Sequence, residues 1–325
     1  MKPHILGIDL GGTKVQAAVL DSDARVVGRA RAKTRAWRDD EEVFATITRI
    51  GHRAIENAGV APSNLAAVAI GAPGPIDANT GYIIESVNLG FTNFPLGPRL
   101  SSEFGCQTIV ENDVNAGVYG EFKAGAARGA NGVVGIFVGT GIGGGLILNG
   151  ALHHGFTGNA GEIGHMVVEA GGPRCNCGNR GCLEAVASRT AITRDIRKAI
   201  KRGRPSLASK LLKKNTELLS GKELKSLYDA GDELVIESVK RAARMIGVGI
   251  GSLMNVLAPE VIVLGGGLVE AFEADFIERI DRTARSISFD INSKDVKITR
   301  AELGDDAGVI GAAMLAREAL ARTSD

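Results

Sequence analysis

Short apolar runs joined by glycine-containing turns occur twice along the chain, in the same order. Residues Ile5–Leu20 contain two apolar runs around such a turn, and residues Val133–Leu148 repeat the pattern. This pattern predicts a β-hairpin in each segment. Each hairpin is followed by a later apolar run that ends in glycines, Leu65–Ile70 in the first half and Val261–Leu264 in the second. We therefore expect two α/β halves related by duplication.

Between the predicted strands, apolar residues recur every three or four positions, which is typical of amphipathic helices. The helices predicted in this way are Glu41–Ala58, Val114–Ala124, Leu234–Leu257 and Asp305–Ala321. The second half also carries additional charge-rich residues from about Ser188 to Lys225, which we expect to be helical, with a loop near Gly203.

The segment Val133–Leu152 contains no charged residue and is long enough to cross a bilayer. Its glycines, three of them consecutive at Gly143–Gly145, argue against a helix because each costs about 1 kcal/mol relative to alanine. We therefore expect strands and no membrane span. At the N-terminus, Lys2 is followed by a strand-like run broken by Asp9, which is unlike a secretory signal. With only four cysteines, a cytoplasmic protein without a disulfide framework is favoured.

Composition narrows the class of ligand. The chain has 325 residues and a net charge of +1, so no broad basic field favours nucleic acid or an anionic membrane surface. Glycine is the unusual component, with 44 residues gathered in short runs after apolar stretches. Backbone N–H groups at two glycine-rich hairpin tips facing one cleft would form anion sites. Nucleotide phosphates are the expected ligand.

Two common phosphate-binding motifs do not fit. Residues Gly7–Gly12 have the glycine spacing of a Walker loop, but Thr13 and Lys14 reverse the required order of lysine and hydroxyl residue. Residues Gly139–Gly144 fit dinucleotide spacing, but the following Leu146–Leu148 indicates a strand rather than a helix.

A metal-ligand pattern lies in the second half. His165, Cys175, Cys177 and Cys182 supply one imidazole and three thiolates within a polar, glycine-containing segment. This donor set completes the tetrahedral shell of a structural zinc. Cys106 lies far away in the sequence, and we expect it to be a buried apolar residue.

Three acids stand near these motifs. Glu162 and Glu184 flank the cysteine segment, where they would either accept hydrogen bonds from ligand hydroxyls or remain solvated surface groups. Asp113 follows the apolar run Thr108–Val110 and precedes a predicted helix. From spacing alone, Asp113 is equally an N-cap or a general base beside a phosphate cleft.

Together these segments resemble the ROK family of repressors and sugar kinases. The resemblance spans essentially the whole chain and rests on Gly7–Lys14, Gly71–Pro75, Val87–Phe91, Glu111–Asp113, Gly139–Gly144, Gly161–His165, the cysteine set with Glu184, and Gly265–Gly267. It implies an actin/hexokinase-like fold of two ribonuclease-H-like domains, with ATP and sugar in the interdomain cleft. The expected domains are residues 1–115 together with 303–325, and residues 116–302 with the zinc loop.

The resemblance also implies residue roles. Asp113 matches the family's catalytic base. The positions that match sugar-binding residues are Gly71, Gly74, Asn88, Asn112, Asp113, Glu162, His165 and Glu184. The positions that match nucleotide-binding residues are Asp9, Gly11, Gly12, Thr13, Lys14, Gly139, Thr140, Gly141, Gly265 and Gly266, with Asp9 expected to handle Mg²⁺ through water.

The implied activity is ATP-dependent phosphorylation of a hexose, with glucose favoured. Kinases for N-acetylglucosamine, N-acetylmannosamine, allose or fructose share most of the motifs, and some relatives accept polyphosphate. The alternative is a protein that is not an enzyme, either a sugar-responsive repressor or a non-catalytic sugar sensor. Such repressors carry a helix-turn-helix ahead of the kinase-like body, for which a first strand starting at Ile5 leaves no room. The sequence itself says nothing of oligomeric state, but members of the family are often dimers or tetramers, so the resemblance implies a homodimer or homotetramer.

Overall fold

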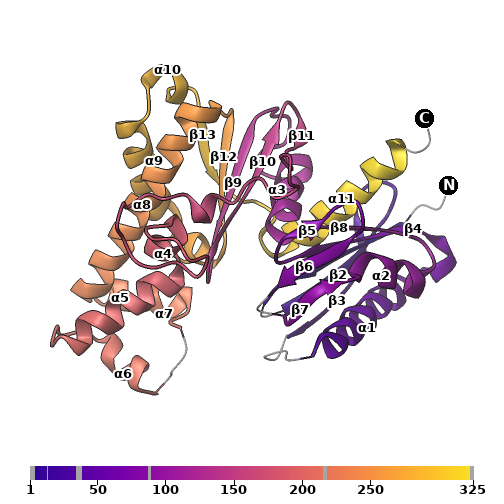
Figure 1. Ribbon diagram of the computed structural model, residues 1–325, viewed down its shortest axis with the longest axis horizontal. Helices are drawn as coiled ribbons and strands as arrows, with labels where there is room; N and C mark the ends of the chain where they lie inside the picture. Colours follow the sequence, from indigo (N-terminus) through magenta and orange to yellow (C-terminus); the bar gives the residue numbers. More distant parts are fainter. Residues whose placement is uncertain (1–3, 13, 34–38, 87–88, 215–217, 323–325) are drawn as a thin grey trace.

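The computed structural model describes residues 4–12, 14–33, 39–86, 89–214 and 218–322. Two five-stranded sheets organise the molecule, one in each half (Figure 1). The first has the order β3-β2-β1-β4-β8 and the second β11-β10-β9-β12-β13. The first sheet contains β1 (His4–Leu10), β2 (Lys14–Leu20), β3 (Val26–Lys33), β4 (Leu65–Ala72) and β8 (Gln107–Asn112). The second contains β9 (Val133–Val138), β10 (Ile142–Leu148), β11 (Ala151–Leu152), β12 (Val261–Gly265) and β13 (Lys297–Arg300).

The two sheets have the same topology, which confirms the duplication. In each, an antiparallel hairpin, β1–β2 or β9–β10, pairs in parallel with one later strand, β4 or β12, and that strand pairs in parallel with the next. The apolar segment Val133–Leu152 forms three strands of the second sheet. Among the described residues, no helix is both long and apolar enough to cross a membrane. A small third sheet joins β5 (Ile76–Asp77), β6 (Tyr82–Ser86) and β7 (Phe91–Phe94).

Helices cover both faces of the first sheet. Helices α1 (Asp40–Ala58) and α2 (Leu96–Phe104) bury branched and aromatic side chains, such as Ile47 and Phe104, against one face. The last helix, α11 (Ala307–Arg322), returns to cover the opposite face through small residues including Ala312 and Ala316. Figure 1 shows α11 beside this sheet, far in sequence from every strand that it contacts there. The first half is therefore completed by the end of the chain.

Helix α3 (Asp113–Ala124) packs against α11 and also contacts the second sheet. The two helices approach so closely that a Cβ on Gly311 would lie 1.7 Å from the Ala116 carbonyl oxygen. A Cβ on Gly120 would lie 2.4 Å from the Ala307 carbonyl oxygen. Only glycine permits this contact at both positions, because any side chain would overlap backbone atoms of the other helix.

Glu121 stabilises the connection between β13 and α11 through hydrogen bonds. Its fully buried carboxylate accepts hydrogen bonds from the backbone N–H groups of Ala126 (2.9 Å), Glu302 (3.0 Å) and Leu303 (2.8 Å). These bonds satisfy the carboxylate, one N–H group in the turn after α3, and two N–H groups where the chain passes from the second sheet toward the first. Nothing in the local sequence marks Glu121 for this role.

The remaining helices belong to the second half. They are α4 (Leu183–Ala187), α5 (Arg189–Lys201), α6 (Ala208–Lys214), α7 (Gly221–Asp229), α8 (Glu233–Leu257), α9 (Gly267–Ile287) and α10 (Asp290–Ser293). Short 3₁₀ turns occur at Pro62–Asn64, Ile163–His165 and Gly304–Asp306. The predicted helical region from Ser188 to Lys225 is formed by α5, α6 and α7. The start predicted for the last helix, Asp305, is wrong by two residues, because Gly304–Asp306 forms a 3₁₀ turn before α11.

We expect Gly311→Ala to destabilise the protein by about 1–3 kcal/mol, because the added methyl group forces apart two packed helices. Thermal unfolding would measure the loss. Gly267→Ala is the matched control: it also adds a methyl group to a helical glycine, but nothing lies within 4 Å of the new Cβ. Equal melting temperatures for the two variants would contradict the importance of the α3–α11 contact.

Candidate active site

Three parallel strands of the first sheet bring Asp9, Gly71 and Glu111 into one row. Asp9 of β1 is in register with Gly71 of β4, and Gly71 is in register with Glu111 of β8. Asn112 and Asp113 follow directly at the start of α3. The carboxyl ends of parallel strands are where α/β proteins bind ligands, so this edge of the sheet is the candidate site.

Asn112, not Asp113, is the N-cap of α3. Its side-chain oxygen accepts hydrogen bonds from the N–H groups of Val114 (3.0 Å) and Asn115 (3.1 Å). Asp113 is the first helical residue, and its carboxylate also accepts from the Val114 N–H at 3.0 Å. Because Asn112 already caps the helix, the capping interpretation does not account for the carboxylate of Asp113.

Two carboxyl groups of the site, those of Asp113 and Asp9, have raised pKa values. Burial raises the pKa of Asp113 to about 6, with a further contribution from the charge of Glu162, while the Val114 N–H opposes the shift. Burial also raises the pKa of Asp9 to about 7; Asp113 and Asp305 add to this shift, and Lys14 opposes it. A carboxylate with a pKa near neutrality is suited to accept a proton from a hydroxyl.

A cavity of about 320 Å³ lies between the two sheets and brings together Asp9, Lys14 and Asp113 from one side and Phe137 and Gly266 from the other. Asp305, just before α11, also lines it, and the Lys14 ammonium lies 2.5 Å from the Asp305 carboxylate. Four predicted site residues thus meet in one cavity. The predicted positions Gly11, Gly12, Gly139, Thr140, Gly141 and Gly265 are not among its lining residues. Thr13 lies outside the described residues.

The tip of the second hairpin carries a cation that the sequence did not reveal. Arg189, the first residue of α5, donates to the Thr140 hydroxyl at 2.6 Å, and the neighbouring Thr190 hydroxyl donates to the Thr140 carbonyl at 2.7 Å. Burial lowers the pKa of Arg189. Glu184 reaches the same tip, where its carboxylate accepts from the Ile142 N–H at 3.0 Å.

A second, much smaller cavity of about 20 Å³ lies at the carboxyl end of β8. Asn112 and Glu162 line it together with Glu111, Asn115 and Asn159, so it also combines residues from both halves. A Cβ added at Gly71 would lie 3.2 Å from the Asp113 Cα, closer than ordinary van der Waals contact. Gly74 adopts a φ of +110°, a conformation that favours glycine. Asn88 lies outside the described residues.

His165 connects this cavity to the cysteine cluster. One ring nitrogen, Nε2, lies 3.7 Å from the Glu162 carboxylate, and the other, Nδ1, lies 3.6 Å from the Cys175 sulfur. The four predicted ligand atoms of His165, Cys175, Cys177 and Cys182 all lie within 4.8 Å of one another. Cys106 lies elsewhere, half-buried against the core of the first half.

Comparison with known proteins gives a consistent result. The family model described as "ROK family" matches residues 5–319. The glucokinase of Halalkalibacterium halodurans is 34% identical over 314 residues, covering 96% of this chain and 94% of that protein. The ROK hexokinase structure from Thermus thermophilus aligns with a TM-score of 0.82 at 33% identity, covering 98% of this chain and 99% of the other. A ROK family glucokinase from Streptomyces griseus, solved with glucose and AMPPNP, aligns with a TM-score of 0.82 at 31% identity, covering 97% and 99%.

The two duplicated halves, the cavity between their sheets and these structural matches define an actin/hexokinase-like, two-domain fold with an interdomain cleft. The chain belongs to the ROK family. The exact domain boundaries, at residues 115/116 and 302/303, stay a prediction.

We expect Asn112→Ala to lower the free energy of unfolding by about 1 kcal/mol, because it leaves the first N–H groups of α3 without their cap. Asn112→Ser, which retains a capping oxygen, is the matched control. Chemical denaturation of both variants would measure the difference. If Asn112→Ser lost as much stability as Asn112→Ala, the side-chain oxygen would not be the stabilising group.

Proposed function

We propose that this sugar kinase transfers the γ-phosphoryl group of ATP to the 6-hydroxyl of a hexose, D-glucose being the favoured substrate. The observation that carries the proposal is the position of Asp113. Asp113 lines the cavity of about 320 Å³ together with Asp9 and Lys14, and the residue before it, Asn112, lines the smaller cavity together with Glu162. The pKa of Asp113, about 6, makes it both ionised at neutral pH and basic enough to accept the hydroxyl proton.

In this proposal the larger cavity receives the nucleotide. Lys14 and the backbone of Gly266 face it from opposite halves, so a bound phosphate chain would touch both domains. The positions at the hairpin tips, from Gly11 to Thr13 and from Gly139 to Gly141, would contact the phosphates once the domains approach. Arg189, held against Thr140, adds positive charge at one tip. The Streptomyces griseus relative, solved with AMPPNP, supports ATP as the donor.

A magnesium ion fits beside Asp9. Burial raises the pKa of Asp9 to about 7, and repulsion from the nearby Asp113 and Asp305 adds to this shift. A divalent cation at this cluster would relieve the repulsion and supply charge neutralisation for the phosphates. Asp9 would hold it through water, and Asp113 would remain free to accept the proton.

The smaller cavity would open to hold the sugar. Asn112 and Glu162 line it, His165 lies against Glu162, and Glu184 follows the zinc loop. Gly71, Gly74 and Asn88 complete the proposed sugar contacts. Carboxylates and amides accept and donate hydrogen bonds to hydroxyl groups, so this set suits a polyol. The glucokinase of Halalkalibacterium halodurans supports glucose among the hexoses.

The cysteine cluster fits a structural zinc ion. The sulfurs of Cys177 and Cys182 lie 3.7 Å apart, close to the spacing of about 3.8 Å expected for two thiolates on a tetrahedral zinc. His165 would bind through Nδ1 and direct Nε2 toward Glu162. The ion would therefore fix the orientation of a proposed sugar contact and take no part in phosphoryl transfer.

Two alternatives remain within the family. A kinase for N-acetylglucosamine, N-acetylmannosamine, allose or fructose would use the same base, and polyphosphate could replace ATP. A sugar-responsive regulator without activity would not need the raised pKa of Asp113, which favours the enzyme. A coupled assay with ATP or polyphosphate over a panel of hexoses tests the proposal, and the absence of turnover with every hexose would overturn it. A cytoplasmic homodimer or homotetramer stays a prediction.

We expect Asp113→Asn to lower kcat by about 10²–10⁴-fold, because an amide cannot accept the hydroxyl proton. Glucose affinity, measured by calorimetry, should change less than about tenfold, since the amide retains the shape. In the wild type, kcat should fall as the pH drops below about 6, where Asp113 becomes protonated.

The matched control for that variant is Asp40→Asn, which also changes the first residue of a helix, α1, but lies outside the cavities. It should keep the wild-type kcat and pH profile. A kcat for Asp113→Asn above about a tenth of wild type would exclude Asp113 as the base.

We expect the purified protein to contain one zinc ion per chain and Cys177→Ser to lose most of it, with a larger rise in KM for the sugar than for ATP. Metal analysis together with steady-state kinetics would test this. Cys106→Ser is the matched control and should retain the metal, because Cys106 lies outside the cluster. Active wild-type enzyme without zinc would contradict the assignment.

A further inference from the structure

Glu111 is a buried carboxylate with an unusually complete set of partners. It is only 9% exposed. Its Oε1 atom accepts hydrogen bonds from the Asn112 N–H (2.9 Å) and from the side-chain amide of Asn115 (3.0 Å), and its Oε2 atom lies 2.7 Å from Nε2 of His154. Burying a carboxylate is unfavourable unless such partners compensate it. The fold therefore maintains all three contacts together.

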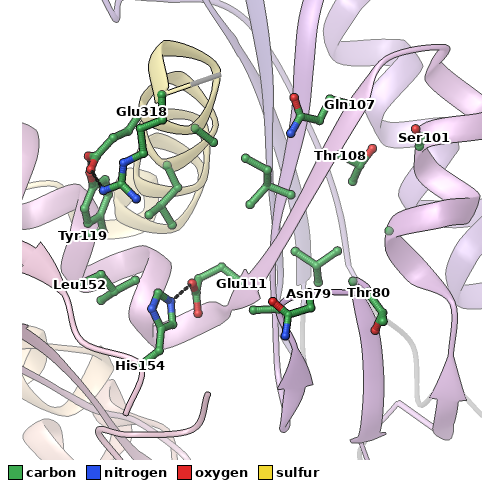
Figure 2. Close-up of a pocket in the computed structure, with 18 of the residues that line it drawn as sticks. Asn79, Thr80, Ser101, Gln107, Thr108, Glu111, Tyr119, Leu152, His154 and Glu318 are labelled. Atoms are coloured by element: carbon green, nitrogen blue, oxygen red, sulfur yellow. Dashed lines mark hydrogen bonds and ion pairs between the residues drawn. The ribbon is translucent and has the colours of Figure 1, made fainter. Parts of the chain in front are cut away.

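The partner His154 belongs to the other half of the molecule. It follows β11, and the backbone N–H of the preceding His153 donates to the Leu146 carbonyl of β10 at 2.8 Å. The carbonyl of His154 accepts from the Ala160 N–H at 2.9 Å. His154 is thus anchored to the second sheet, whereas Glu111 ends the first. Figure 2 shows the two side chains pointing toward each other, at the edge of a groove of about 780 Å³.

From Glu111 the contacts lead directly to the proposed base. Both groups bonded to Oε1, the Asn112 N–H and the Asn115 amide, belong to the capping turn that encloses Asp113. The chain after His154 runs through Asn159 to Glu162, which lines the same small cavity as Glu111. The pair therefore lies between the turn that carries the base and the segment that carries a proposed sugar contact.

We propose that Glu111 and His154 are positioning residues that fix the Asp113 turn of one half against the sugar-binding segment of the other. The inference rests on the proposed kinase function. Because this contact joins the two halves, it links the placement of the base to the placement of the sugar. Neither residue need touch the reacting atoms. Because the pair positions the turn that carries the base, its loss should lower kcat more than it weakens nucleotide binding.

The contact between His154 and Glu111 makes the pair sensitive to pH. The hydrogen bond to Glu111 raises the pKa of His154 above its ordinary value, and burial opposes this shift. The other charged groups at this groove are Glu318 and Arg322 of α11, which lie 2.5 Å apart, and Tyr119 of α3 donates to Glu318. Protonated His154 thus makes a charge-assisted bond to Glu111, and this bond weakens as pH rises through the pKa of His154.

Steady-state kinetics of His154→Ala and His154→Gln test the proposal, with His153→Gln as the matched control because His153 is the exposed neighbouring histidine. We expect His154→Ala to lower kcat about tenfold or more while KM for ATP changes less than threefold. His154→Gln, which can still donate a hydrogen bond, should recover much of this loss. The wild type and His153→Gln should lose activity at alkaline pH, whereas His154→Gln should lack this alkaline limb and keep the acid limb from Asp113.

A kcat for His154→Ala equal to that of His153→Gln, or an unchanged alkaline limb in His154→Gln, would overturn the proposal. A readout independent of activity is the NMR titration of the His154 ring. Its pKa should fall in Glu111→Gln, and an unchanged pKa would also overturn the pairing. If the wild type phosphorylated no hexose, the proposed function would fail, while the titration would still decide whether the pair links the two halves.

Discussion

The close crossing of α3 and α11 is the contact on which the arrangement of the two halves depends. Gly120 and Gly311 let the helix backbones touch, and the buried carboxylate of Glu121 holds the strand that leads into α11. Helix α3 begins at the proposed base and packs on the second sheet, while α11 covers the first. The crossing therefore sets the separation of the sheets, and with it the width of the cavity between Asp9 and Gly266.

The acids gathered in that cavity reduce the stability of the fold at neutral pH. Asp9 and Asp113 have raised pKa values in the folded protein, so the folded state binds more protons than the unfolded chain at intermediate pH. Stability consequently decreases as pH rises from the ordinary aspartate pKa of about 4 through the folded values of about 6 and 7. Burial is the largest cause of both shifts, so the cost follows from enclosing these carboxylates between the two halves.

Sequence patterns predicted those features that depend on neighbours along the chain. The duplicated hairpins, the position of Asp113 at a strand end and the cysteine cluster all follow from local spacing, and the structure places them as expected. Other features were not predictable in this way. The pairing of Glu111 with His154 and the bonds from Glu302 and Leu303 to Glu121 join residues distant in sequence, and a glutamate destined for burial has no local signal. Which of Asn112 and Asp113 caps α3 likewise depends on where the helical backbone begins, which the local sequence does not specify.

The return of α11 to the first sheet has a consequence for biosynthesis. Strands β1 to β4 and β8 leave the ribosome early, yet the face formed by residues such as Ile5 and Ala69 stays uncovered until Val309 and Ala313 are made. The second half, whose sheet and helices lie between residues 133 and 300, can complete its own core before that moment. The amino-terminal half, although synthesised first, is thus the last to reach its final structure, and a nascent chain halted before residue 307 exposes an apolar surface that chaperones would have to shield.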